Sequence, residues 1–481
     1  MILKIEEWIR KIDDLVWGPW LLFLLLGTGI YLMVRLRFLP LKNLKFAFAC
    51  ALGREKQRPA AQGKEPTPSG RRPSRRARKR SASSGQISAL SSLTTELAAT
   101  MGTGNIIGVA TAMALGGPGA LFWMVAASLI GMATKLVEST LSVTYRGKNE
   151  AGQTVGGPMY TMAAALPGKL PGRILGFLFA LFAVFASFGM GNMTQANSIA
   201  DALYVTFQVP RAATALAVTV LTILIVLGGI GHIAKLTRLM VPFMGIFYLL
   251  GTVAVIVTHW QNLPLALGGI LTAAFCPRAV SGGLFGTVLV SAGQSLRWGV
   301  SRGIFSNEAG LGAAGISAAA ADTEDPVKQG YISMTGVFLD TVVMCSLTGL
   351  ALAVSGTFGM TDAKGNPLTG TALTLAAFQS TLGDWGEKFI SVSIVLFAFA
   401  TIAGWAYQGE RAFEFLMRGK VAYNIWYRFV YALMAFVGCV CSLEVVWNLS
   451  DICNALMAVP NLICVLWLSG GVCGRIREYG G

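Results

Sequence analysis

Long apolar runs separated by short polar breaks cover most of the chain. They predict helical spans near residues 15–35, 88–115, 118–145, 173–204, 212–231, 236–258, 283–321, 329–357, 386–410, 421–442 and 446–470. The hydrocarbon core of a bilayer is about 30 Å thick and requires roughly 20 apolar residues per helix. Strands of a membrane barrel would instead be shorter and would alternate polar with apolar residues. We therefore expect an all-α integral membrane protein with about 11 transmembrane helices.

Glycines interrupt two of these spans. Gly102 and Gly104 lie within 88–115, and several glycines surround Ser306, Asn307 and Glu308 within the later span. Unwound backbone is tolerated inside a bilayer only where protein or a watery cavity satisfies its polar groups. If the first span is an accessory helix, ten spans remain, five in each half, and each half opens with a broken helix. Such an inverted 5+5 repeat predicts a transporter with its site at the two breaks.

The same scheme divides the chain into regions. They are an extracytoplasmic N-terminus with an accessory helix (1–35), a cytoplasmic basic loop (36–86), a first repeat (87–258), an outer loop (259–282), a second repeat (283–470) and a cytoplasmic C-terminus (471–481). The predicted inner segments carry more Lys and Arg than the outer ones, which agrees with the positive-inside rule. The first 13 residues mix acidic and basic side chains, so we expect the first span to be retained rather than cleaved.

Composition and charge change this picture little. Hydrophobic residues make up 54% of the chain and charged residues 13%. Of the formal net charge of +15, residues 54–80 carry +9 in a stretch rich in Pro and Ser, which predicts a disordered loop that contacts anionic lipid. This stretch lacks interleaved aromatic residues, so nucleic-acid binding is not expected. The eight cysteines show no metal spacing and only His232 and His259 exist, so no haem or zinc site is expected.

The string from Ala98 to Gly108 admits two interpretations. Ile107 stands where a dinucleotide fingerprint has glycine, which excludes that motif. Gly104 and Gly108 are spaced for close helix packing. Alternatively, glycines let the backbone unwind, so that amides of a half-helix bind a carboxylate and nearby carbonyls, with the Asn105 amide oxygen, bind a cation or an ammonium group.

Further polar residues lie within later spans. A carboxylate at the depth of Glu308 is costly and requires a partner. Arg297 or Arg302 is predicted to pair with it as an inner gate, and direct substrate contact is the alternative; Ser306 and Asn307 are grouped with these residues as gating or structural polar residues. Lys135 and Glu138 are interpreted as neutralising each other one turn apart.

Two more spans carry candidate pocket residues. Asn192 and Gln195 follow Phe188 on a polar helix face, and Thr401 precedes Trp405 in the ninth span. Hydrogen bonding between helices explains the first set equally well, and filling of a gap in the core explains the second. Glu96 precedes the first break without a clear role.

Six strings carry a resemblance to a known family. They are GTGNIIGVATAMALGGPGALFWM (102–124), GGPMYTM (156–162), GNMTQANSIADAL (191–203), GVSRGIFSNEAGLG (299–312), DPVKQG (325–330) and GWAYQGE (404–410). With them the chain resembles the alanine or glycine:cation symporters, also called sodium:alanine symporters. Val125 stands where the family usually has tryptophan, and the basic insert at 54–80 is not typical of it.

The resemblance implies a LeuT-type fold of the amino acid, polyamine and organocation superfamily, and sodium-coupled import of small neutral amino acids by alternating access. The implied substrate residues are Thr100, Gly102, Thr103, Gly104, Asn105, Phe188, Asn192, Gln195 and Trp405. The implied sodium residues are Ala98, Met101, Asn105 and Thr401. We therefore expect a multi-pass protein of a prokaryotic cytoplasmic membrane, with its N-terminus outside, that binds an amino acid, sodium and lipid but no organic cofactor.

Other functions stay open. Proton coupling through Glu96, Glu308 or Asp340 is the alternative within the same fold, and a nutrient sensor without flux is another. The zinc-protease, nucleophile-elbow and phosphate-loop motifs of enzymes are absent from the sequence, so an enzyme is not expected.

Overall fold

The computed structural model describes residues 2–54, 86–167, 169–276, 279–281, 288–362, 365–441 and 443–480. Most of the predicted basic loop, including all of its residues from 55 to 80, lies outside the described residues. The described chain is almost entirely helical, with two short antiparallel hairpins. The prediction of an all-α protein is therefore confirmed.

The N-terminal segment contains more helix than its sequence indicated. It comprises α1 (Ile2–Val16), α2 (Pro19–Arg35), α3 (Leu39–Lys42) and α4 (Leu44–Ala51). The predicted accessory span corresponds to α2, but the expectation of a loop from residue 36 is wrong over α3 and α4. Phe46 of α4 packs edge-on against Tyr331, with ring centroids 5.2 Å apart, so burial of this apolar segment stabilises the short helix.

The first half begins with a broken helix followed by four helical spans. Its elements are α6 (Ala89–Thr100), η1 (Thr103–Asn105), α7 (Ile107–Gly116), α8 (Gly119–Thr144), β1 (Gly147–Lys148), β2 (Thr154–Val155), α9 (Pro158–Ala165), α10 (Lys169–Phe188), η2 (Gly189–Met193), α11 (Thr194–Phe207), α12 (Arg211–Leu227) and α13 (Gly229–Thr258). The π-helical turn η2 joins α10 to α11 in one span.

The second half repeats this order. Its elements are α15 (Ala292–Asn307), α16 (Ala313–Ala319), α17 (Pro326–Val337), η5 (Phe338–Cys345), α18 (Ser346–Ser355), α19 (Gly370–Leu382), α20 (Asp384–Leu416), η6 (Val421–Tyr423), α21 (Asn424–Val440) and α22 (Leu443–Gly480). A π-helical segment, η5, lies inside the second span of this half, whereas η2 lies inside the third span of the first half. Because each half has five spans, the order agrees with the expected inverted repeat.

Three expectations about the connections are wrong. The predicted outer loop contains η3 (Trp260–Asn262) and α14 (Leu263–Phe275), and the broken helix begins only at Ala292, because β3 (Ala279–Ser281) pairs with β4 (Val288–Val290). The helix α19 was not anticipated. The predicted C-terminal tail is instead the last part of α22, which continues to Gly480.

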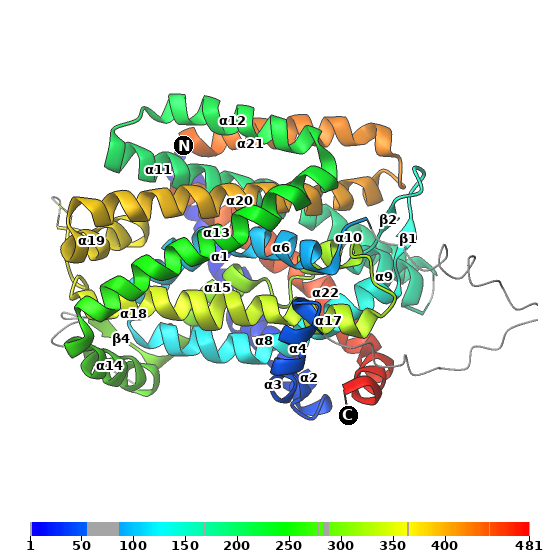
Figure 1. The fold of residues 1–481 in the computed structure, drawn as a ribbon, viewed down its shortest axis with the longest axis horizontal. Coiled ribbons are helices and arrows are strands. Elements are labelled where there is room, and N and C mark those ends of the chain that lie inside the picture. The colour runs from blue at the N-terminus through cyan, green and yellow to red at the C-terminus, as the bar shows by residue number, and fades with distance from the viewer. Residues whose placement is uncertain are drawn as a thin grey trace, which may run out of the picture.

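The helices pack so that both breaks lie in the interior. The helix α8 packs against α15 and α17, while α20 packs against α10, α11 and α13. The broken helix α6 is enclosed by α13, α16, α17 and α20. Figure 1 shows α12 (green) and α21 (orange) side by side at one edge of this bundle.

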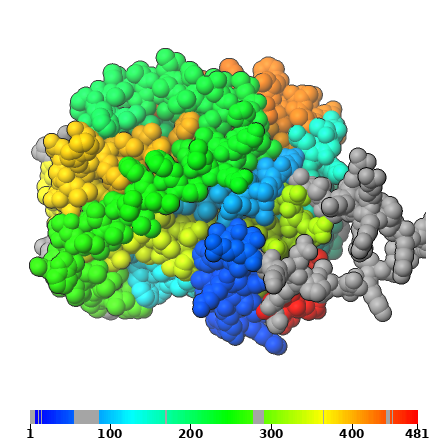
Figure 2. Space-filling view, in the orientation of Figure 1, coloured from blue at the N-terminus to red at the C-terminus, as the bar shows by residue number. Residues whose placement is uncertain are grey.

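The outer surface is apolar. Six helical segments of the described chain are long and apolar enough to cross a membrane: 119–144, 170–207, 229–258, 326–355, 384–416 and 450–480. Large exposed side chains on α12 and α13 include Leu224, Leu239 and Leu250, and Figure 2 shows these two helices (green) covering much of one face. An apolar surface of this kind faces lipid rather than water.

Candidate functional site

The first break interrupts the helical hydrogen bonds between α6 and α7. The Gly102 amide donates to the Thr100 carbonyl (2.8 Å) instead of to the Ala98 carbonyl four residues back. The Thr103 amide donates to Oε1 of Gln195 (3.1 Å), which replaces its lost helical partner. Both residues are buried, so the side chain of α11 satisfies backbone that the break exposes.

The Ala98 carbonyl released by the break accepts a hydrogen bond from the α20 hydroxyl of Thr401 (2.9 Å). A Cβ atom at Gly102 would overlap this hydroxyl and come within 3.1 Å of Oε1 of Gln195. Only glycine fits between the two oxygens. The structure thus brings together Ala98 and Thr401, two of the residues that the resemblance implies for sodium, beside Gly102, which it implies for the substrate.

The second break follows α15. Glu308 adopts the left-handed conformation (φ 57°), and Gly310 and Gly312 also have positive φ (94° and 82°) before α16 begins. The Leu311 amide donates to the Glu308 carbonyl (3.2 Å), so the Asn307 carbonyl loses its helical partner. Both predicted breaks are therefore present at the positions expected from the glycines.

The two breaks touch each other. A Cβ atom at Gly104 would lie 3.2 Å from the Ser306 Cα atom, so the backbones approach closely because residue 104 is glycine. Asn105 donates to Asp340 Oδ1 (2.8 Å), and the hydroxyls of Ser306 and Thr341 donate to Asp340 Oδ2 (2.8 Å each). Asp340, from the π-helical segment η5, therefore links the breaks through one buried carboxylate.

One acceptor in this group has no partner in the described chain. Oδ1 of Asn105 is buried and accepts no hydrogen bond, while its amide nitrogen is held by Asp340. From the sequence, Asp340 is interpreted either as a proton relay or as a residue at a helix end. Its hydrogen bonds to Asn105 and Ser306 could not be foreseen, because Asp340 is 235 residues from Asn105 in the chain.

Glu308 extends toward α20 rather than back along α15. Its Oε1 accepts a hydrogen bond from Nε1 of Trp405 (2.8 Å), and its Oε2 is buried and has no hydrogen-bond partner among the described residues. A Cβ atom at Gly191 would overlap the Trp405 side chain, so the indole packs directly on η2. Trp405 and Glu308 therefore lie together between the second break and η2, which the sequence did not indicate.

The predicted pairing of Arg302 with Glu308 as an inner gate is wrong. Arg302 instead forms a bidentate ion pair with Asp451 of α22 (2.6 and 3.2 Å), enclosed by the rings of Phe305 and Trp447. Six residues separate Arg302 from Glu308, which is about 9 Å along a helix, and the left-handed turn at Glu308 directs its side chain elsewhere. The guanidinium of Arg297 lies over the ring of Trp298 (5.8 Å).

The remaining predicted pocket residues lie on the same helix face near η2. Asn192 donates to the Tyr431 carbonyl (2.5 Å), and Gln195 donates to the Met190 carbonyl (3.0 Å). The ring of Phe188 stacks on Tyr427, with centroids 5.5 Å apart. Gln195 thus reaches the first break, whereas Asn192 and Phe188 make contacts with α21 that stabilise helix packing.

A cavity of about 430 Å³ lies elsewhere, among α11, α12, α13 and α20. Its lining includes Leu203, Val218, Leu221, Met240 and Phe399. Such an apolar lining does not satisfy the charges of an amino acid or an ion, so the candidate site is at the breaks.

Comparison with known proteins decides the family. The sodium:alanine symporter family matches residues 2–66 and 71–481. The chain belongs to this family. It is 42% identical to sodium/alanine symporter AgcS of Methanococcus maripaludis, over 98% of this chain and 96% of that protein. It is 33% identical to amino-acid carrier protein AlsT of Bacillus subtilis, over 97% of this chain and 90% of that protein.

A solved structure supports the fold independently. The chain resembles MhsT, in complex with L-phenylalanine, with a TM-score of 0.59 and 13% identity over 80% of this chain and 89% of that chain. This likeness confirms the predicted LeuT-type fold. This member of the sodium:alanine symporter family is therefore a multi-pass membrane transporter, and the family consists of symporters rather than enzymes.

Proposed function

We propose that this symporter imports a small neutral amino acid such as alanine together with sodium. The observation that carries the proposal is the Thr401 hydroxyl on the Ala98 carbonyl, which places two oxygen atoms at the first break beside Gly102. Sodium prefers such oxygen ligands, and Met101 lies at the same turn. The name of sodium/alanine symporter AgcS supports the same pair of ligands, and the name of amino-acid carrier protein AlsT supports an amino acid as substrate.

A second cation position is supported by Asn105. Its buried, unpartnered Oδ1 is a free acceptor, and the carboxylate of Asp340 beside it supplies negative charge. The substrate carboxylate would use the backbone amides of Gly104 and, in place of Gln195 Oε1, of Thr103, both in η1 just before α7. The unpartnered Oε2 of Glu308 beside Trp405 suits the substrate ammonium group.

Sodium dependence tests this proposal. Replacing external sodium with choline at constant pH is expected to reduce alanine accumulation in vesicles to background, because the ligands at the first break would lack their cation. Accumulation that continues in choline and collapses when the proton gradient is dissipated would instead establish proton coupling. The buried carboxylate of Asp340 favours that second candidate, since it lies between both breaks. Binding of alanine without flux would favour a sensor.

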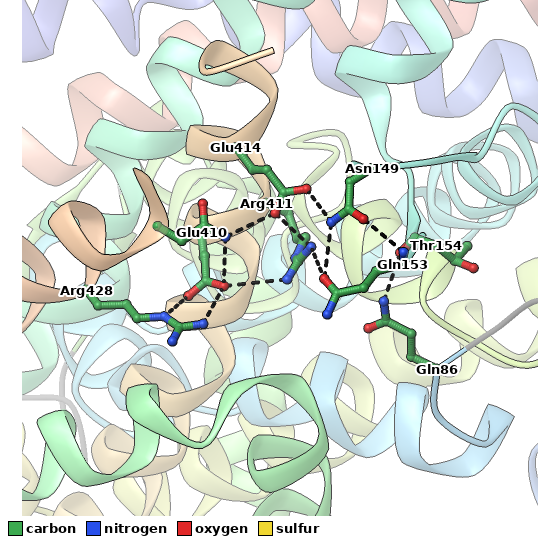
Figure 3. A network of polar contacts seen from close by, with 9 residues as sticks. Gln86, Asn149, Gln153, Thr154, Glu410, Arg411, Glu414 and Arg428 are labelled. Carbon is green, nitrogen blue, oxygen red and sulfur yellow. Dashed lines mark hydrogen bonds and ion pairs between the residues drawn. The ribbon is translucent and has the colours of Figure 1, made fainter. Parts of the chain in front are cut away.

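Alternating access requires closure on both sides of the site. In the proposed orientation, with the N-terminus outside in a cell membrane, the Arg302–Asp451 pair lies on the outer side. On the inner side, the β1–β2 hairpin holds the end of α20, as Figure 3 shows: Asn149 donates to Glu414 (2.8 Å), and Arg411 donates to Gln153 (3.2 Å). Sodium and substrate would each raise the affinity for the other by favouring the same state.

Loss of the contacts between the β1–β2 hairpin and α20 should open the inner end of the transport pathway. The double variant Asn149→Ala, Gln153→Ala removes both contacts to α20. Ala321 is a buried residue just after α16, and its carbonyl accepts a hydrogen bond from Arg146 beside β1 (2.9 Å). A cysteine introduced there by Ala321→Cys is expected to react about 3-fold faster or more with an impermeant maleimide in inside-out vesicles of the double variant. The matched control is Glu150→Ala, which changes an exposed residue of the same hairpin. Equal labelling rates with and without the hairpin contacts would contradict a role in closure.

A further inference from the structure

The second break contains a cation that belongs to the protein itself. Lys135 of α8 is 1% exposed, and its Nζ donates to the Asn307 carbonyl at 2.9 Å. This carbonyl is the one that loses its helical donor, because the Leu311 amide turns to Glu308 instead. The ammonium group therefore supplies the missing donor at the C-terminal end of α15, where the helix dipole favours positive charge.

The surroundings of Lys135 keep the ammonium at this point. Its Nζ lies 3.5 Å from Oε1 of Glu96 on α6, and both side chains are 1% exposed. The structure thus differs from the predicted pairing of Lys135 with Glu138. Glu138 accepts instead from Asn461 of α22, whose Nδ2 also donates to the Gly310 carbonyl (2.9 Å).

Two carbonyls of the second break are therefore held by side chains from other helices. Lys135 holds Asn307, and Asn461 holds Gly310. An ion pair buried among apolar helices is costly to form and costly to leave half complete. Because the ammonium also pairs with Glu96, it joins the inner half of the first broken helix to the outer half of the second.

The fixed end of α15 leads directly to the candidate site. Ser306 precedes Asn307, donates to Asp340, and lies against Gly104. Asp340 in turn holds Asn105 at the first break. A shift of the Asn307 carbonyl would therefore move Ser306 and, through Asp340, the Asn105 amide.

We propose that Lys135 is a positioning residue: a tethered cation that fixes the second break, so that Ser306 and Asp340 hold Asn105 where sodium and substrate bind. The proposal rests on the proposed function and adds a residue to it. At the first break the released carbonyl would receive an exchangeable ion. At the second break, the Asn307 carbonyl already binds the ammonium group of Lys135, which is part of the protein. The second break therefore needs no transported cation.

A charge-compensated pair of substitutions separates positioning from stability. Lys135→Met alone leaves Glu96 buried without its ion-pair partner, so it is expected to lower the melting temperature. The double variant Lys135→Met, Glu96→Gln removes both charges and should recover much of that temperature. If Lys135 positions the break, the double variant should still show about a 10-fold higher half-saturation concentration for sodium. Glu96→Gln alone keeps the bond to Asn307 and should shift that concentration less.

The matched control is Thr222→Val, which removes a buried hydroxyl that bonds to the Val218 carbonyl within α12 (2.7 Å), a helix that packs mainly against α21 rather than against the broken helices. Its sodium and alanine half-saturation should match the unaltered protein. Unaltered half-saturation in the double variant would overturn the proposal and leave Lys135 a purely structural partner.

Alanine counterflow needs no ion gradient, so it can test the proposed sodium coupling and the positioning role of Lys135 separately. If sodium has no effect on the unaltered protein, the proposed function fails. The alanine half-saturation of the compensated double variant then still tests Lys135: about a 10-fold rise supports positioning, and an unchanged value refutes it.

Discussion

Gly102→Ala is expected to reduce sodium-dependent alanine uptake about 100-fold or more while leaving the protein folded. The added methyl group would overlap the Thr401 hydroxyl and crowd Oε1 of Gln195. The backbone of residue 102 is extended (φ −120°), so alanine can adopt it and the effect arises from the site rather than from strain. Uptake into vesicles and melting temperature in detergent measure the two effects separately.

The matched control is Gly108→Ala, in the same broken helix. A methyl group there would have one neighbour within 4 Å, the Thr103 carbonyl at 3.9 Å, which is an ordinary contact. Its uptake should stay close to that of the unaltered protein, and because alanine favours helix more than glycine does, its stability should not fall. Normal sodium affinity in Gly102→Ala would remove Thr401 and Gly102 from the proposed ion site.

Thr401→Val is expected to raise the sodium concentration for half-maximal uptake about 10-fold or more. Valine keeps the shape of threonine but lacks the hydroxyl that reaches the Ala98 carbonyl. Thr401→Ser keeps that hydroxyl and should restore much of the affinity. Uptake measured against sodium concentration, at saturating and at low alanine, distinguishes weaker ion binding from a slower cycle.

Ser393→Ala provides the comparison on the same helix. The Ser393 hydroxyl is buried and bonds to the Phe389 carbonyl of its own helix (2.9 Å), about two turns from Thr401. Its removal tests the loss of a buried hydroxyl in α20 without touching the break. If Thr401→Val and Ser393→Ala raise the sodium concentration for half-maximal uptake equally, the Thr401 hydroxyl does not bind the ion.

The sequence predicted the breaks because glycines inside long apolar runs have a local physical meaning. Gly102 and Gly310 interrupt helices at the expected places, and Thr401 reaches Ala98 as expected. The short helices α14 and α19 escaped prediction because 13 residues are too few to cross a bilayer, so their apolar character was assigned to loops.

The partners of buried charges could not be predicted for a different reason. Arg302 has Glu308 six residues away in the chain, yet its partner Asp451 is 149 residues away. Lys135 likewise lies one turn from Glu138 but pairs with Glu96 on another helix. Sequence spacing gives neighbours on one helix surface, whereas a buried ion pair is decided by which helices pack together.

The length of α20 has a mechanical consequence. One uninterrupted helix of 33 residues presents Thr401 to the first break, Trp405 to Glu308, and Arg411 to the β1–β2 hairpin. Thr401 and Arg411 are ten residues apart, or about 15 Å along the axis. A tilt of α20 by a few degrees would displace the Thr401 contact at the proposed ion site and the Arg411 contact at the hairpin at the same time. The release of cargo and the opening of its exit would then be a single motion, with no relay of intermediate side chains between them.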